Sequence, residues 1–296
     1  MAGRIGSGPI RRRVDESMTM KNKQNEEQRE TVGDRVGHAF GNTRGQEKDH
    51  VYEIGTEVGD LDENGLLKPY AYQGLFAQIA ERHLSLFDLN VDRTLKYNLA
   101  WALVSLSLEF KKPVEGNMRL FATTWHSEHR GPFFRRELVF RNADGEVMFH
   151  GSTFSVLLDV EKRSVYRKRE LPFPITSPIE EFTIDASPTS KDNPPLEAYG
   201  QRDVLNSHID CLGHVNNCRY GEYAHDALTA EECRNLRNLG RMDIHFISEL
   251  RKGDTFSILK AVESQETGNR ITIQGRNNAA DTVAFDVSFT FTDRLV

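Results

Sequence analysis

One short stretch, residues 208–217 (HIDCLGHVNN), gathers the residue types that could do chemistry. Asp210 and His214 are four positions apart, so a carboxylate and an imidazole could face one cleft. Gly213 lets the backbone turn tightly. The amides that follow would begin a helix, where unpaired N–H groups and the helix dipole favour negative charge. We therefore predict catalytic roles for Asp210 and His214. The residues predicted to form an oxyanion site or to position the substrate are Gly213, Val215, Asn216 and Asn217.

Glu249 is the third catalytic candidate, because it stands where a strand should end and a turn begin. A carboxylate placed there against His214 could orient a water molecule or tune the imidazole. Each candidate also has a purely structural interpretation. Glu249 could be a solvated turn residue that pairs with Arg251 or Lys252, His214 could be satisfied in a polar core, and Asp210 could be a helix N-cap.

The elements that must position these residues follow one another in the same order twice. In the first half, a polar turn at 60–65 precedes a helix whose apolar spacing places Leu75, Ile79 and His83 on one face. In the second half, the turn at 208–213 precedes a helix over 215–228. The strands predicted from alternating apolar residues are 52–59, 101–110, 118–125, 135–142, 146–160, 241–248, 255–263, 270–277 and 282–293.

The two halves also match at single positions. With a fixed offset of 148, Asp62 falls on Asp210, Gly65 on Gly213, and Tyr72 on Tyr220. A connector with six prolines between positions 172 and 195 separates the halves, and proline disfavours both helix and sheet interiors. This repeated order indicates an internal duplication.

One helix followed by a run of strands, twice, indicates an α+β fold. We predict a tandem (double) hot-dog, in which each half is a long antiparallel sheet wrapped around a central helix. The predicted parts are a disordered tail or leader at 1–48, an N-terminal hot-dog domain at 49–170, a proline-rich linker at 171–197, and a C-terminal hot-dog domain with the catalytic motif at 198–296.

Composition narrows the class of protein. The net charge of −6 argues against a broad nucleic-acid-binding surface. No apolar run reaches the ~20 residues of a membrane span, and no apolar segment follows Arg11–Arg13 as in a signal peptide. The three cysteines cluster without a CxxC pair, so no zinc ribbon is indicated. We expect a cytoplasmic protein.

The run Asp210-x-x-Gly213-His214-Val215-Asn216-Asn217, followed by Tyr220, resembles the second-domain motif of acyl-ACP thioesterases. The resemblance covers roughly residues 51–295. It implies hydrolysis of a fatty acyl thioester on acyl carrier protein, with release of free fatty acid and without cofactor or metal. It also implies that the catalytic Asp, His and Glu are Asp210, His214 and Glu249.

One position departs from that family's pattern. The motif's catalytic asparagine is Leu212 here, which cannot hydrogen-bond an oxyanion or a water molecule. Losing such a donor can cost ~10²–10³ in rate. Asn64 occupies the matching position of the first half, where Leu66 stands in place of the histidine. Asn216 is the residue that could compensate.

The resemblance also implies a partner and a pocket. Acyl carrier proteins are acidic, so docking needs a local basic patch; the candidates are Lys162, Arg163, Arg167, Lys168 and Arg169, to which Arg135 and Arg136 add. These cations could equally be a solvated strand end. The acyl-chain pocket is predicted at Phe76, Ile79, Leu103 and Val104, all of which could instead be plain core. A homodimer is a further expectation.

Three rival functions remain open on these residues. An acyl-CoA thioesterase would use the same chemistry on another carrier, and a hot-dog dehydratase also needs an aspartate and a histidine in one cleft. A non-catalytic acyl-binding double hot-dog protein is the third, and Leu212 is the feature that favours it.

Overall fold

The computed structural model describes residues 47–168, 170–190, 194–210, 212–265 and 268–292. The chain divides into two units, Met1–Val51 and Tyr52–Val296. In the first unit the described part contains one 3₁₀ turn, η1 (Glu47–Asp49), so the predicted tail lies almost wholly outside the described residues. All that follows concerns the second unit.

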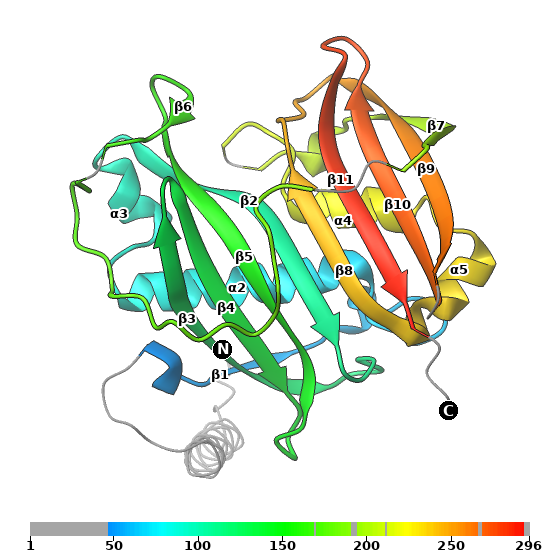
Figure 1. Ribbon diagram of the computed structural model, residues 1–296, viewed down its shortest axis with the longest axis horizontal. Helices are drawn as coiled ribbons and strands as arrows, with labels where there is room; N and C mark the ends of the chain where they lie inside the picture. The colour runs from blue at the N-terminus through cyan, green and yellow to red at the C-terminus, as the bar shows by residue number, and fades with distance from the viewer. Residues whose placement is uncertain (1–46, 169, 191–193, 211, 266–267, 293–296) are drawn as a thin grey trace, which may run out of the picture. The chain divides into compact units, whose positions relative to one another are not determined.

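The second unit is built on one eleven-stranded antiparallel sheet (Figure 1). The strands are β1 (Tyr52–Gly55), β2 (Leu99–Phe110), β3 (Arg119–Arg130), β4 (Phe133–Arg141), β5 (Val147–Asp159), β6 (Ser164–Val165), β7 (Glu197–Asp203), β8 (Leu239–Phe246), β9 (Thr255–Gln265), β10 (Gly268–Asn277) and β11 (Thr282–Phe291). Their order across the sheet is β1-β3-β4-β5-β2-β8-β11-β10-β9-β7, with β6 paired to β5.

That order is the same in both halves, read in opposite directions from the centre. β2 and β8 hold the equivalent place in each half and pair with one another, with Ser107 opposite Asp243. The Ser107 hydroxyl donates a 2.6 Å hydrogen bond to Asp243 Oδ1 at this seam. The tandem hot-dog prediction is therefore confirmed as two sheets joined edge to edge in one chain.

Helices lie on one face of this sheet (Figure 1). They are α2 (Pro69–Leu86), α3 (Val91–Leu95), α4 (Cys218–His225) and α5 (Ala230–Arg234), with 3₁₀ turns η2 (Val58–Asp60), η3 (Asn206–His208) and η4 (Asn235–Asn238). None of the helices in the described ranges is both long and apolar enough to cross a membrane.

The sequence of α2 explains its start, its end and its buried face. Pro69 occupies the first helical turn, where its missing N–H costs nothing. The helix ends before Asp88, whose φ of 56° is left-handed. The predicted stripe is buried, with Leu75, Ile79 and His83 at 4%, 0% and 0% exposure, so this face packs on the sheet.

α2 and α4 also pack on one another. The Gln73 side chain on α2 donates a 3.1 Å hydrogen bond to the carbonyl of Asn217, which caps α4. A Cβ at Gly221 would lie 2.1 Å from Gln73 Oε1, so a larger residue there would have to displace the Gln73 side chain. The helix of the first half is thus fixed against the start of the second-half helix.

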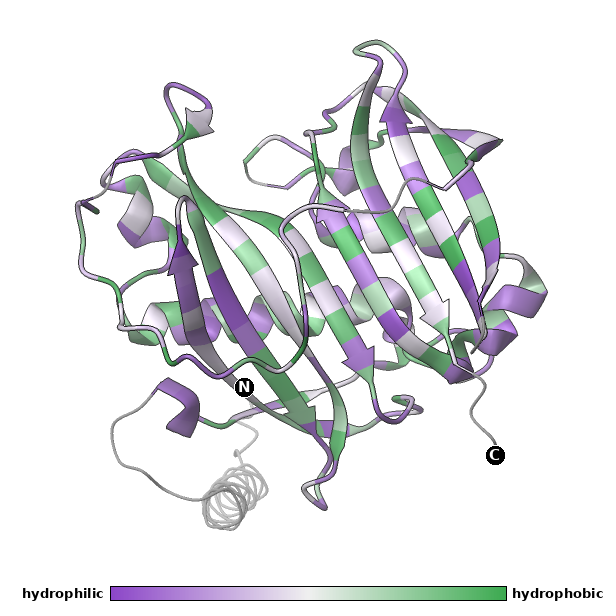
Figure 2. Cartoon of the chain, in the orientation of Figure 1, coloured by the Kyte–Doolittle hydropathy of each residue, from purple (hydrophilic) through white to green (hydrophobic). Residues whose placement is uncertain are grey.

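Apolar and polar side chains alternate along most strands, as Figure 2 shows for β8, β11 and β10. In β4, Leu138 and Phe140 enter the core beneath α2, whereas Arg135 and Glu137 face the opposite side of the sheet. Phe140 stacks on Phe149 of β5 at 4.4 Å between ring centroids. Period-two patterning therefore divides the sheet into an apolar and a polar face.

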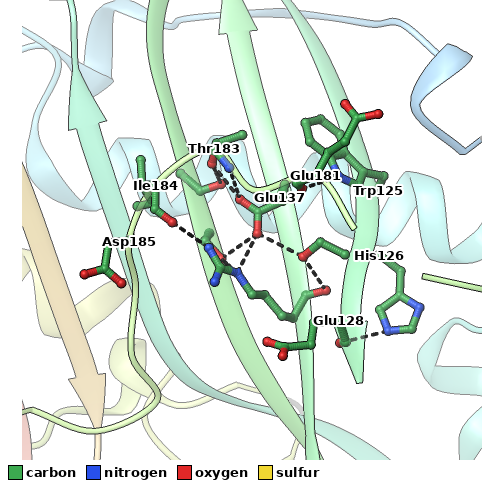
Figure 3. A network of polar contacts seen from close by, with 12 residues as sticks. Trp125, His126, Glu128, Glu137, Glu181, Thr183, Ile184 and Asp185 are labelled. Carbon is green, nitrogen blue, oxygen red and sulfur yellow. Dashed lines mark hydrogen bonds and ion pairs between the residues drawn. The ribbon is translucent and has the colours of Figure 1, made fainter. Parts of the chain in front are cut away.

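The proline-rich connector lies across that polar face (Figure 1). Glu137, fully buried, is at the centre of the contact, and its Oε2 accepts hydrogen bonds from the backbone and hydroxyl of Thr183 (Figure 3). Trp125 Nε1 donates to the carbonyl of Glu181 at 2.9 Å. The connector is therefore bound to the sheet by specific hydrogen bonds.

Arg135 belongs to the same network. Its Nε lies 2.6 Å from Glu137 Oε1, and its Nη2 donates to the carbonyl of Ile184 at 2.6 Å. The guanidinium is buried because it neutralises a buried carboxylate. The prediction that Arg135 adds to a carrier-docking surface is therefore wrong.

One strand was missed by the sequence prediction, and one helix starts later than predicted. β7 (Glu197–Asp203) was not predicted, because all seven of its residues are exposed at the sheet edge and show no alternation. α4 begins at Cys218, three residues later than the predicted start, because Val215 instead pairs with Ile209 across the turn.

Candidate active site

A tight turn between Ile209 and Val215 carries the first two catalytic candidates. Ile209 and Val215 form a β-bridge, and within it the Asp210 N–H donates to the carbonyl of His214 at 3.0 Å. Gly213 has a φ of 83°, which a residue with a side chain rarely adopts. The glycine therefore allows the chain to reverse so that Asp210 and His214 lie side by side.

The Asp210 carboxylate has two different contacts. Its Oδ1 accepts the backbone N–H of Leu212 at 2.9 Å, and its Oδ2 lies 3.5 Å from His214 Nδ1. His214 Nδ1 is also 3.3 Å from the carbonyl of Val215. Both neighbours of Nδ1 are acceptors, so the tautomer with a proton on Nδ1 fits best, and Nε2 is then left to accept a proton.

Glu249 is brought beside this turn by the backbone. It follows β8 and precedes Leu250, whose carbonyl accepts a 2.8 Å hydrogen bond from the Val215 N–H. Two arginines hold its carboxylate: Arg163 Nη2 lies 2.5 Å and Arg251 Nη2 lies 2.9 Å from Glu249 Oε2.

The charges around Glu249 set its protonation. Partial burial by itself raises the pKa of the carboxyl. The hydrogen bond from Arg251 and the charges of Arg163, Arg251 and, when it is protonated, His214 outweigh it and hold the pKa below its ordinary value. Glu249 and His214 thus interact electrostatically, although no direct hydrogen bond joins their side chains among the described contacts. The carboxylate is ionised at neutral pH.

Tyr220 of α4 lies behind the same group, and the sequence did not identify it as a site residue. Burial raises the pKa of its phenol to about 12, and the carboxylates of Glu249 and Asp210 contribute to that rise. Its ring packs on Phe246 and Phe285 at 5.6 Å and 4.8 Å. Tyr220 therefore stays uncharged at neutral pH near the carboxylates of Glu249 and Asp210.

Three of the backbone amides predicted to bind an oxyanion already have acceptors. The N–H groups of Gly213, Val215 and Asn216 donate to the carbonyls of Asp210, Leu250 and His208. The helix whose free amides were expected at this point starts only at Cys218. The structure therefore corrects the prediction of an oxyanion site at the amides of Gly213 and Val215.

The side chain of Asn216 offers another donor. Its Oδ1 accepts the backbone N–H of Cys218 at 2.9 Å, which fixes the orientation of the amide and leaves Nδ2 to donate. Asn217 supplies its carbonyl to Gln73. Asn216 and Asn217 both line the cavity next to the turn.

That cavity has a volume of about 340 Å³ and runs along α2. Gln73, Phe76, Ala80 and Leu84 line it from one stripe of the helix. Eleven helical steps separate Gln73 from Leu84, which at about 1.5 Å each is roughly 16 Å. The lining contributed by the second half consists of Asp210, Asn216, Asn217 and Cys218.

A second, more polar hollow of about 470 Å³ reaches the turn from another side. It shares Asp210, Asn216 and Cys218 with the first cavity, and its remaining lining includes Asp60, Arg219 and Glu222. An elongated ligand could therefore occupy both hollows with its centre beside Asp210. In the described part of the chain, no three His, Cys, Asp or Glu side chains are grouped to hold a metal ion.

Two family models match this chain in succession. The acyl-ACP thioesterase N-terminal domain matches residues 47–170, and the acyl-ACP thioesterase C-terminal domain matches residues 199–291. The chain belongs to the acyl-ACP thioesterase family. It is a thioester hydrolase that acts on acyl-ACP.

Solved structures share the fold of this thioesterase. An acyl-ACP thioesterase from Bacteroides thetaiotaomicron is 20% identical with a TM-score of 0.66, covering 82% of this chain and 97% of that one. A putative oleoyl thioesterase from Lactobacillus plantarum is 16% identical (TM-score 0.65, coverage 82% and 96%). The 12:0-ACP thioesterase from Umbellularia californica is 13% identical (TM-score 0.64, coverage 81% and 96%). A search of curated protein sequences found no match.

The predicted acyl-pocket residues of the thioesterase divide into two pairs. Phe76 and Leu103 line the 340 Å³ cavity. Ile79 is fully buried in the main core instead. Val104 falls at a β-bulge, where the register of β2 against β5 shifts between Leu103 and Ser105, and it does not line the cavity.

Several residues that line this cavity were not predicted from the sequence. Trp101 and Phe134 line the cavity and pack edge to face with ring centroids 5.0 Å apart, and Leu89 lines it beside them. Trp101 precedes Leu103 by two positions in β2, so the period of the strand could have identified it.

The predicted docking cations lie on and after the loop between β5 and β6. Lys162, Arg163, Arg167 and Lys168 are exposed, and Arg169 lies outside the described residues. Lys162 pairs with Asp159 at 3.1 Å, whereas Arg163 reaches Glu249. Arg136, the other added candidate, lines the 340 Å³ cavity.

Proposed function

We propose that this thioesterase releases free fatty acid from acyl carrier protein through a water molecule activated by Glu249 and His214. The observation that carries the proposal is the convergence of three ionisable side chains on one turn. Asp210 Oδ2 lies 3.5 Å from His214 Nδ1, and His214, when protonated, interacts with the charge of Glu249. Asp210 lines the cavity at the same point.

In this mechanism the two basic groups act on one water molecule. Glu249 is ionised because neighbouring cations lower the pKa of its carboxyl, so it can accept a hydrogen bond from water. With Nδ1 directed at Asp210, His214 presents Nε2 to take up the proton as the water attacks the thioester carbonyl. The imidazolium can then return that proton to the departing thiolate of phosphopantetheine.

The negative charge that develops on the carbonyl oxygen needs a donor, and Asn216 is the best placed. Its Oδ1 is fixed by the Cys218 N–H, so Nδ2 is held in one direction. Asn216 lines both hollows where they meet. We assign it the role that the family's asparagine would have at Leu212. Leu212 itself is 46% exposed and contributes only its backbone N–H to Asp210.

The two hollows differ in polarity, and this difference sets the orientation in which the substrate would bind. The 340 Å³ cavity, with Phe76, Ala80, Leu84 and Trp101 in its wall, suits the acyl chain because apolar surface there is removed from water. The more polar hollow suits the pantetheine arm, whose amides need hydrogen-bonding partners. A basic docking surface on Lys162, Arg163, Arg167 and Lys168 stays part of the proposal.

The decisive experiment measures hydrolysis of a panel of acyl-ACP and acyl-CoA thioesters by the wild type and by Glu249→Gln. We expect kcat to fall ~10²–10⁴ in the variant, the usual contribution of a general base. Glu115→Gln is the matched control: this carboxylate lies beside the first-half turn and pairs with Arg237 at 3.0 Å. Equal rates for Glu249→Gln and the wild type would remove Glu249 from the mechanism.

The same panel separates the alternatives. Preference for coenzyme A thioesters would make the protein an acyl-CoA thioesterase, and a bound fatty acid without turnover would make it an acyl-binding protein. Two further predictions accompany the proposal: a cytoplasmic location, and a homodimer, which light scattering of the purified protein would detect.

A further inference from the structure

The loop between β5 and β6 reaches from the first half of the chain to the catalytic carboxylate of the second. Arg163 in this loop lies 2.5 Å from Glu249, although 86 positions separate the two residues. Arg163 adopts a left-handed φ of 50°, which is uncommon for a residue with a side chain. The loop is therefore shaped so that its arginine meets Glu249.

Both arginines bind the same oxygen. Arg163 Nη2 and Arg251 Nη2 each contact Glu249 Oε2. A carboxylate oxygen that accepts two guanidinium groups is a weaker base than a free one, since each cation stabilises the ionised form. While Arg163 is in place, Glu249 is restrained and poorly suited to take up a proton.

This ion pair is open to competition. The side chains of Arg163 and Arg251 are 58% and 54% exposed, and that of Glu249 is 37% exposed. Exposed pairs of this kind contribute little stability, because water and salt screen the two charges. An acidic group on a docking partner could therefore take Arg163 from Glu249 at little cost.

The neighbouring residues favour such a partner. Lys162, Arg167 and Lys168 stand close to Arg163 in sequence and are exposed. Asp159, which binds Lys162, and Glu161 are the acids of the same loop. Opposite charge on an incoming protein would be attracted to this group of cations.

We propose that Arg163 couples carrier docking to hydrolysis: an acidic side chain of the carrier protein binds Arg163, and the Glu249 carboxylate released by that exchange acts on the water beside His214. The inference rests on the proposed function of Glu249. Arg163 is a positioning residue, because it acts only through Glu249.

After Arg163 leaves, the charged or titratable groups near Glu249 among the described residues include Arg251 on its own loop, His214 and Asp210 on the turn, and Tyr220 on α4. Arg251 still binds Oε2, so the carboxylate stays beside the turn. Docking would thus change how strongly Glu249 is restrained without moving it away from the site.

The test compares Arg163→Gln with the wild type on two substrates that carry the same acyl chain, acyl-ACP and acyl-pantetheine. With acyl-pantetheine, which has no acidic protein to displace Arg163, kcat/KM of the variant should rise several-fold. The acid limb of the variant's pH–rate profile should move to higher pH, because losing a nearby cation raises the pKa of the Glu249 carboxyl. With acyl-ACP, KM should rise and kcat should not.

Two further measurements sharpen the result. Apo-acyl carrier protein, which lacks the pantetheine arm, should stimulate hydrolysis of acyl-pantetheine by the wild type and not by Arg163→Gln. Arg276→Gln is the matched control, because Arg276 also binds an acid, Asp281, at 2.8 Å on an exposed hairpin. The Arg276→Gln variant should hydrolyse both substrates at the wild-type rate.

An unchanged or lower rate of Arg163→Gln on acyl-pantetheine would overturn the coupling while leaving the hydrolase intact. Failure of the wild type to hydrolyse either substrate would be a different result, since it would remove the proposed function and the coupling with it.

Discussion

The two turns that precede α2 and α4 have nearly the same backbone but different side chains. Asp62 and Asp210 each donate their N–H to the carbonyl four residues on, at 2.8 Å and 3.0 Å. Gly65 and Gly213 have φ values of 74° and 83°. The β-bridges that close the turns are Leu61–Leu67 and Ile209–Val215.

Each turn is also tied to the same part of its half. The Leu67 N–H donates to the carbonyl of Val114 at 2.9 Å, as the Val215 N–H does to that of Leu250. Val114 and Leu250 are both fully buried. By this equivalence, the residue preceding Val114 is Pro113, where the second half has Glu249.

The differences lie in the groups that could do chemistry. Leu66, 3% exposed, stands where the second half has His214. Asp62 Oδ2 lies 3.4 Å from the amide Nδ2 of Asn64, whereas Asp210 Oδ2 faces the imidazole. Both aspartates use Oδ1 to accept a backbone N–H two residues on.

The residues that the two turns share have structural roles, and those that differ are the candidates for chemistry. An aspartate is present in both turns, so its first role is to hold the turn. An imidazole with a nearby carboxylate occurs in only one of them. We therefore expect the chemistry of the second turn to come from His214 and Glu249, with Asp210 supporting the imidazole.

The largest expected effect comes from giving the second turn the residue of the first. His214→Leu should lower kcat on acyl-ACP by ~10²–10⁴. The fold should be retained, since Leu66 occupies the same backbone without strain. Thermal unfolding and single-turnover hydrolysis measure the two effects. His150→Leu, which removes a half-buried imidazole beside Glu109 on the other face, should leave kcat unchanged. Activity within threefold of the wild type in His214→Leu would make the turns chemically equivalent.

A smaller effect separates the two aspartates. Asp210→Asn keeps an oxygen for the Leu212 N–H but loses the charge that faces His214, so kcat should fall about tenfold, as expected for a charge-assisted hydrogen bond of about 1.5 kcal/mol. Asp62→Asn should leave kcat unchanged, and both variants should unfold near the wild-type temperature. Equal losses of kcat in the two variants would contradict a special role for Asp210.

Much of the fold could be predicted because burial imposes a period on the sequence. The stripe on α2 and the alternation in β2 to β5 are direct consequences of one buried face. β7 has no buried face, so its sequence carries no such signal. Val104 was misassigned for a related reason: the bulge in β2 breaks the alternation, and a bulge is not visible in the residue types.

The candidate site was predictable only where its parts are close in sequence. Asp210 and His214 are four residues apart and share a glycine turn, whereas Glu249 was assigned mainly through the family resemblance. The contact between Arg163 and Glu249 joins two exposed residues of different halves. An exposed ion pair leaves no apolar pattern, so the sequence carries no signal for this contact.

The smallest expected effect tests the one position where the second turn has lost a polar group that the first retains. Leu212→Asn should place an amide near Asp210 Oδ2, as Asn64 is placed near Asp62 Oδ2. If the new amide also donates to the thioester carbonyl oxygen, one hydrogen bond of about 0.5–1.5 kcal/mol is gained, so kcat/KM on acyl-ACP should rise about 2- to 10-fold. The reciprocal variant Asn64→Leu should leave kcat/KM unchanged. A lower kcat/KM in Leu212→Asn would mean that Asp210 Oδ2 is needed for His214 alone. The new amide would then compete for Oδ2 and weaken the contact that orients the imidazole.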